Sequence, residues 1–124
     1  MDLKTNYIYK ILSSMEWEDA SESEIIITEL DKKDGFVHLS TAKQLSATLA
    51  LYFSHCQEVI LLRILSETLK DKLVYEYPDS KERTVKFPHY YGELKKSYIE
   101  KNWVLKRRAF EVPKEILLEA EAQQ

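Results

Sequence analysis

The chain contains only two glycines in 124 residues, and each lies inside a short motif rich in aromatic and polar residues. Gly35 follows Asp34, and Gly92 follows Tyr91. Average usage would give roughly 9 glycines in a chain of this length. The phosphate-binding loops of P-loop enzymes and of dinucleotide-binding βαβ units need several glycines close together. The sequence therefore excludes both of these loops and directs attention to the two glycine motifs.

The first motif, residues 34–41, reads DGFVHLST and combines a turn, a short strand and the start of a helix. Asp-Gly favours a turn because glycine adopts positive φ at no steric cost. The alternation that follows turns His38 and Ser40 toward one face of a strand, while Val37 and Leu39 anchor in the core. We therefore expect His38 and Ser40 to point at a shared site. His38 also fits the simpler role of a half-buried histidine bonded to a backbone carbonyl.

Thr41 ends this motif and stands three residues before Gln44, the spacing of a capping box that starts a helix. Leu45, Leu49 and Phe53 then repeat at helical intervals, so we expect a core-facing helix up to about Phe53. Capping is the simpler role for Thr41, and contact with a ligand is the alternative.

The second motif, residues 87–92, reads FPHYYG. Proline biases the preceding residue toward an extended conformation. His89 is followed by Tyr90, Tyr91 and Gly92, and two tyrosines beside a histidine form either a pocket wall or a loop that covers the core edge. We predict that both motifs line one cavity, with His38 and His89 facing into it.

The other segments predict a single α+β domain over residues 1–124. We expect strands at residues 7–12, 25–28, 59–64 and 73–77, and one or two strands within 97–112. A capping box of Ser13 and Glu16 predicts a short helix after Ser13. A helical turn is expected at 65–70 and a final helix at about 113–122, which begins at Pro113. Residues 31–33 read as a solvated loop.

Two charged residues have both a structural and a functional interpretation. Lys10 interrupts an apolar strand, so it either reaches water from an edge strand or places a cation in the cavity. Glu76 lies at a strand end and is either a surface charge or a catalytic carboxylate beside the histidines. The adjacent His55 and Cys56 lack a third ligand, so no metal site is predicted.

Composition sets the expected environment and excludes several partners. The net charge is −3, without a one-signed block long enough for a nucleic-acid surface. The single cysteine excludes an intrachain disulfide and fits a reducing compartment. Neither a membrane span nor a signal-peptide pattern is present. We expect a soluble cytoplasmic protein without a membrane or nucleic-acid partner.

The two motifs and their order resemble the bacterial family called domain of unknown function 952. The resemblance extends over about residues 7–105 and rests on both motifs together. The matching segments are residues 8–11, Trp17, Ala20, residues 34–41, Gln44, Tyr52, Phe53, residues 59–64, Tyr75, Glu76 and residues 87–94. The segment VHLS is also similar to a motif of RNA 2′-phosphotransferases.

This resemblance implies the fold of the ADP-ribosyltransferases, with two small, mainly antiparallel sheets, a cleft between them and a few flanking helices. In active members of that fold the cleft holds NAD, which makes NAD the implied cofactor. By position, Lys10 stands where relatives usually carry a histidine that bonds the nicotinamide ribose. Glu76 is the counterpart of the glutamate that orients the acceptor.

Three functional interpretations remain open. The first is a cleft that binds a nucleotide or another small molecule without catalysis, suggested by lysine at position 10 and by the lack of an activated nucleophile. The second is an NAD-dependent ADP-ribosyl-transfer enzyme. The third is an acid–base enzyme that uses His38 and His89, with Glu76 orienting one of them. Ligand contacts are expected from Lys10, Ser40, Thr41, Tyr90, Tyr91 and Gly92.

Overall fold

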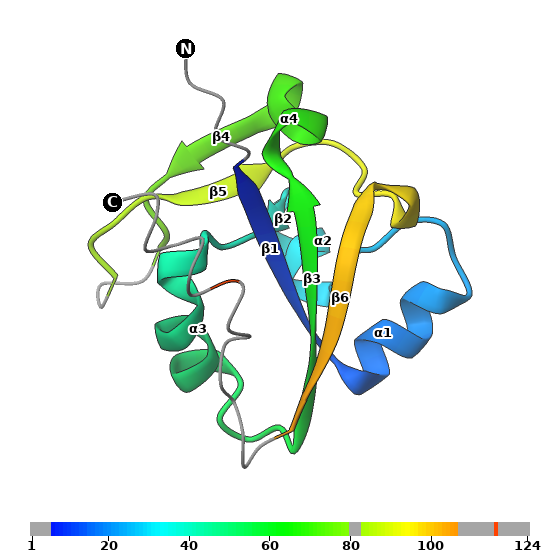
Figure 1. Cartoon of the computed structure of the whole chain (residues 1–124). Helices are drawn as coiled ribbons and strands as arrows, with labels where there is room; N and C mark the ends of the chain where they lie inside the picture. Colours follow the sequence, from blue (N-terminus) through cyan, green and yellow to red (C-terminus); the bar gives the residue numbers. More distant parts are fainter. Residues whose placement is uncertain (1–5, 80–82, 107–115, 117–124) are drawn as a thin grey trace.

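The computed structural model describes residues 6–79, 83–106 and 116 of the chain. This part of the chain has an α+β architecture with two three-stranded antiparallel sheets, shown in Figure 1. The first sheet has the order β1 (Tyr7–Ser13), β3 (Glu58–Leu65) and β6 (Ile99–Lys106). The second has the order β2 (Val37–His38), β5 (Phe87–Tyr90) and β4 (Leu73–Glu76). The predicted pair of small antiparallel sheets is confirmed.

Strand β3 lies between β1 and β6, and its apolar run is explained by burial on both faces. Ile60, Leu62 and Ile64 belong to one core cluster. Val59 and Leu61 belong to a second cluster on the opposite face. Side chains alternate between the faces of a strand, so a strand covered on both sides needs apolar residues at nearly every position. The predicted central strand at residues 59–64 is therefore confirmed.

The first glycine motif connects the two sheets. Tyr9 of β1 and Ser40 exchange backbone hydrogen bonds in both directions, at 2.8 and 2.9 Å. One residue earlier, the Leu39 N–H donates to the Pro88 carbonyl at 3.2 Å. Residues 37–40 thus pair with β5 of one sheet and with β1 of the other. This double pairing places His38 at the junction between the sheets.

Helices α1 (Ser14–Ser21), α2 (Glu29–Asp34), α3 (Leu45–Tyr52) and α4 (Ser66–Leu69) surround the sheets. Short 3₁₀ turns cover Ala42–Gln44, Lys70–Lys72 and Lys96–Tyr98. The predicted capping box of α1 is present, because Ser13 Oγ accepts from Glu16 N–H and Glu16 Oε1 accepts from Ser13 N–H. Thr41 N–H donates to Gln44 Oε1 at 3.0 Å, as expected for the start of the next helix.

Residues 25–33 correct two sequence expectations. The predicted strand at 25–28 is wrong, since only Ile25 forms an isolated bridge, with Lys95. The predicted solvated loop at 31–33 is also wrong, because these residues lie in α2 and Asp31 is buried. Thr28 and Asp31 form a capping box that starts α2, and this local bonding competes with strand formation.

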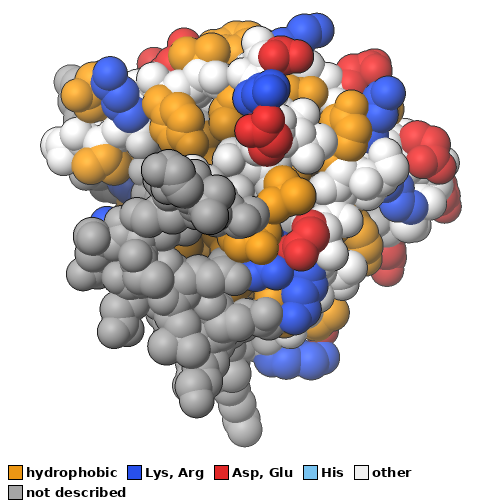
Figure 2. Space-filling view, turned by 45° about the horizontal axis from the view of Figure 1, so that its top comes forward, with side chains coloured by type: hydrophobic (Ala, Val, Ile, Leu, Met, Phe, Trp, Pro, Cys, Tyr) orange, Lys and Arg blue, Asp and Glu red, His pale blue; other side chains and the backbone are white. Residues whose placement is uncertain are grey.

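The end of the chain is described in part. The predicted strand region 97–112 contains β6 up to Lys106. The predicted helix at 113–122 lies outside the described residues except for Ile116, which is buried in the cluster with Val59 and Leu61. None of the described helices is long and apolar enough to cross a membrane. On the face shown in Figure 2, the described basic and acidic side chains are interspersed, so this face presents no one-signed surface to a polyanion.

Candidate active site

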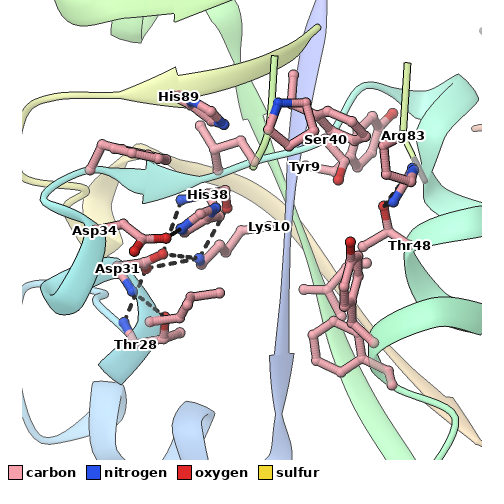
Figure 3. A pocket seen from close by; sticks show the side chains of 18 of the residues that line it. Tyr9, Lys10, Thr28, Asp31, Asp34, His38, Ser40, Thr48, Arg83 and His89 are labelled. Atoms are coloured by element: carbon pink, nitrogen blue, oxygen red, sulfur yellow. Dashed lines mark hydrogen bonds and ion pairs between the residues drawn. The ribbon is translucent and has the colours of Figure 1, made fainter. Parts of the chain in front are cut away.

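A cavity of about 790 Å³ lies where the two motifs meet. His38 and Ser40 of the first motif line it together with Phe87, His89 and Tyr91 of the second. Sites for small organic molecules usually have volumes of about 300–1,000 Å³. The size of the cavity therefore suits a small molecule, and residues some 50 positions apart in sequence come together in its wall (Figure 3).

The two histidines are direct neighbours across the junction of β2 and β5. His38 and His89 are cross-strand partners in the antiparallel register. Their ring centroids are 5.6 Å apart, with the planes at 68°. Phe36 stacks on the His89 ring at 4.0 Å and also lies 4.6 Å from the His38 ring. The register and the shared phenyl contact fix the orientation of both imidazoles.

Each histidine is hydrogen-bonded to a carboxylate of its own. Nε2 of His38 lies 2.8 Å from Oδ2 of Asp34, four residues earlier in the chain. Nδ1 of His89 lies 2.7 Å from Oε1 of Glu76 on the adjacent strand β4. Because a carboxylate accepts hydrogen bonds, each of these ring nitrogens carries the proton in the neutral imidazole.

The other ring nitrogens, Nδ1 of His38 and Nε2 of His89, have no hydrogen-bond partner among the described residues. No buried side-chain nitrogen or oxygen in the described part of the chain lacks a partner. These two nitrogens must therefore reach accessible space, and both residues line the cavity. Both imidazoles thus line one cavity, and each is hydrogen-bonded to a carboxylate through one ring nitrogen while the other ring nitrogen is accessible.

Neighbouring groups shift the pKa values of His38, Glu76 and Tyr91. Burial lowers the pKa of His38, and this effect outweighs the opposing influence of Asp31 and Asp34. Hydrogen bonds from Tyr91 and then from His89 lower the pKa of Glu76. The same bond, between Tyr91 Oη and Glu76 Oε1 at 2.7 Å, raises the pKa of Tyr91. At neutral pH His38 is therefore a neutral base and Glu76 a carboxylate.

Lys10 and Asp31 form a buried ion pair that holds the backbone of His38. Lys10 Nζ lies 2.8 Å from Asp31 Oδ2 and 3.0 Å from Oδ1, and both side chains are almost fully buried. Lys10 also donates to the His38 carbonyl at 3.0 Å, and the His38 N–H donates to Asp31 Oδ1 at 3.0 Å. Burial lowers the pKa of Lys10, whereas Asp31 acts in the opposite direction. Both backbone groups of His38 are thus bound by one ion pair.

The family model described as "Protein of unknown function (DUF952)" matches residues 11–102. The chain belongs to the DUF952 family. A crystal structure of protein CC0527 from Caulobacter crescentus is similar, with 32% identity and a TM-score of 0.75. That match covers 92% of this chain and 98% of the other. A solution NMR structure of CC0527 is 33% identical with a TM-score of 0.71 and covers 87% and 91% of the two chains. No curated protein matches the chain.

Most of the site residues predicted for this DUF952 chain line the cavity: Lys10, His38, Ser40, Glu76, His89 and Tyr91. Tyr90 is buried in the core and, with Gly92, lines a separate hollow of about 620 Å³. Thr41 is outside both linings and serves the helix start. The ammonium group of Lys10 is held by Asp31 instead of extending to water as an edge-strand lysine would.

Sequence reasoning missed three members of the site in this DUF952 chain: Asp31, Asp34 as a histidine partner, and Arg83. The capping-box spacing from Thr28 to Asp31 would have revealed α2, and the four-residue spacing from Asp34 to His38 fits their contact. Among the described residues there is no group of three or more His, Cys, Asp or Glu side chains that could hold a metal ion.

Proposed function

We propose that this cavity binds a small organic molecule and that His38 and His89 transfer protons to and from it. The observation that carries the proposal is the pairing of two carboxylate-bound imidazoles, with ring centroids 5.6 Å apart, in the lining of one cavity. An acid and a base that reach the same substrate are the minimum requirement for general acid–base catalysis.

The two histidines differ in a way that suits different roles. His38 is neutral because burial lowers its pKa, so Nδ1 offers a lone pair as the base. Asp34 accepts the hydrogen bond from Nε2 and stabilises the positive charge that His38 gains with the proton. His89 acts as the acid in the form that carries a second proton on Nε2: it gives this proton to the substrate, and the ionised Glu76, bound to Nδ1, stabilises the cationic ring before the transfer. Each such transfer typically accelerates a reaction by about 10²–10⁴-fold.

The lining suits a flat ligand. Aromatic side chains from several elements surround the cavity: Tyr9, Phe36, Tyr52, Phe53, Tyr77, Phe87 and Tyr91. NAD, which the family resemblance implied, contains flat rings and remains one ligand to test. To bind a ribose, the ammonium group of Lys10 would have to give up its contacts with Asp31 and with the His38 carbonyl. In our proposal Lys10 therefore supports His38 and does not contact the ligand.

The test is an untargeted activity assay. The purified protein is incubated with a protein-free cell metabolite extract and, separately, with NAD, and compound consumption is followed by mass spectrometry. We expect the wild-type protein to consume a compound in the extract. His38→Gln and His89→Gln should each consume that compound more slowly, by about 10²-fold or more. Because His55 also lines the cavity, the control is Lys32→Gln, which changes an exposed side chain that lines neither cavity.

Two results would overturn the acid–base role. One is full turnover by both cavity-histidine variants. The other is a compound that binds to the wild-type protein and is recovered unchanged, which would identify the cavity as a binding site without catalysis.

A further inference from the structure

The positively charged side chains that line the cavity differ in whether they are already paired with a carboxylate. Two cationic side chains line it within the described residues, Lys10 and Arg83. Lys10 is neutralised by Asp31 in the buried ion pair. Arg83 has no carboxylate partner in the described parts of the chain; its contacts there are with a hydroxyl and two aromatic rings. Arg83 is therefore the cation of this lining that a ligand can still pair with.

Arg83 is held in place by contacts that leave its donors available. The guanidinium carbon lies 4.5 Å from the Phe87 ring centroid and 6.0 Å from that of Tyr52. Both terminal nitrogens lie 3.4 Å from Thr48 Oγ1, at the long end of hydrogen-bond distances. A guanidinium carries five N–H donors in a planar fork, so most of this capacity remains unused.

The position of Arg83 separates it from the histidine end of the cavity. Figure 3 shows Arg83 and Thr48 on the side of the cavity opposite to Asp34 and His38. Asp34 and Glu76 line the histidine end and carry negative charge beside the imidazoles. An anionic group of a ligand would be repelled there and attracted to Arg83. Glu16, which caps α1, and Asp79 also line the cavity, so Arg83 is the one positive charge of the described lining that is not already paired with a carboxylate, and an anionic end of a ligand would be directed to it.

We propose that Arg83, assisted by the Thr48 hydroxyl, binds the oxyanion of a flat small molecule, a carboxylate or a phosphate, whose opposite end reaches His38 and His89. This inference rests on the proposed function and specifies its substrate class. Planar bidentate pairing with a carboxylate or phosphate is the interaction for which a guanidinium is suited and a lysine is not. Stacking on Phe87 orients the plane of the fork.

The test uses benzoate and phenyl phosphate as anionic probes and benzamide as the uncharged probe of similar shape. Affinities are measured by chemical-shift titration of the ¹⁵N-labelled protein. We expect both anions, but not benzamide, to shift signals of the cavity residues. Arg83→Gln should weaken anion binding about tenfold or more, and Arg83→Lys should restore it only in part. Thr48→Val should weaken it by a smaller factor.

Lys70→Gln is the matched control, because it removes the same charge from an exposed side chain that lines neither cavity. Preference of the wild-type protein for phenyl phosphate over benzoate assigns the oxyanion as a phosphate, and the reverse preference assigns a carboxylate. Equal anion binding by Arg83→Gln, equal binding of benzamide, or no anion binding by the wild-type protein would overturn the inference. These results are distinct from the His38→Gln and His89→Gln turnover assay, which can succeed or fail independently.

Discussion

Lys10 Nζ and Asp31 Oδ2 are 2.8 Å apart, in a position where almost no surface of either side chain remains exposed to solvent. The pair joins β1 to α2 and binds both the N–H and the carbonyl of His38 in β2. Asp31 Oδ2 also accepts from the Thr28 N–H at 3.0 Å, so the carboxylate is surrounded by donors. A lysine that interrupts an apolar strand is thus a support for the histidine of the site.

Removal of one partner of this pair should be strongly destabilising. Lys10→Met leaves the Asp31 carboxylate buried without its cation, and breaking a buried pair in this way typically costs about 3–5 kcal/mol. Urea denaturation followed by far-UV circular dichroism gives the free energy of unfolding. The double variant Lys10→Met/Asp31→Leu serves as the comparison and should recover part of the loss. A single variant as stable as the wild-type protein would contradict a buried charged pair.

The pKa of His38 predicts a pH dependence of folding. Burial lowers the folded-state pKa below the ordinary value of 6.5, so the unfolded chain binds more protons as the pH falls through that value. Stability should therefore rise with pH between the two pKa values, by up to about 1.4 kcal/mol per pH unit, and be lost on acidification. Urea midpoints measured between about pH 5 and 8 should rise with pH below 6.5 and level off above it as far as His38 contributes, and His38→Gln should reduce this rise.

Direct titration provides an independent check on His38. The imidazole Hε1 signal of His38 in proton NMR should titrate with a midpoint below 6.5. A midpoint above that value would show that the Asp31 and Asp34 charges outweigh burial, and it would assign His38 to the acid role instead of the base role.

The Tyr91–Glu76 hydrogen bond should couple two titrations. Its loss in Tyr91→Phe should raise the pKa of Glu76 toward its ordinary range, because this bond is the largest cause of the lowering. Glu76→Gln should in turn lower the pKa of Tyr91, which the same bond raises. Carbon-13 NMR of labelled carboxyl and tyrosine ring carbons measures both values. Unchanged values in both variants would rule out the bond in solution.

The two glycines should differ in their response to substitution. Gly35 has φ of 82°, and a Cβ added there would meet no atom within 4 Å, so Gly35→Ala incurs only the cost of a left-handed conformation, about 1 kcal/mol. Gly35→Asn should cost less, because asparagine tolerates that region. Thermal melts of these variants measure the differences.

Gly92 poses a steric problem instead of a conformational one. A Cβ there would lie 2.7 Å from Cζ and Oη of the buried Tyr90 ring. Gly92→Ala must therefore displace that ring, and overpacking of this kind costs about 1–3 kcal/mol. The same thermal melts apply, and a Gly92→Ala/Tyr90→Leu double variant should remove the clash. Wild-type stability of Gly92→Ala alone would show that the ring moves freely.

The elements that sequence reasoning predicted well are those in which local pattern and burial agree. Residues 59–64 are apolar at nearly every position because β3 is covered on both faces. Ser13 and Glu16 cap α1 through contacts only three residues apart. The interpretation of residues 25–28 as a strand failed because three isoleucines in succession suit a strand as well as an irregular segment that inserts Ile26 into the core.

The sequence alone determined that His38 lies in a short strand after a turn, since the turn residues and the alternation around it act locally. The expected loop around His89 was wrong, because Phe87–Tyr90 form β5 through pairing with β2 and β4. Only the tertiary structure decided that the two imidazoles are cross-strand neighbours and that Asp34 and Glu76 form hydrogen bonds to them. It also decided that Lys10 forms its ion pair with Asp31. The physical reason is that strand register and ion pairing between distant segments depend on the packing of the whole core. No local propensity encodes which β-strand will be the neighbour of another.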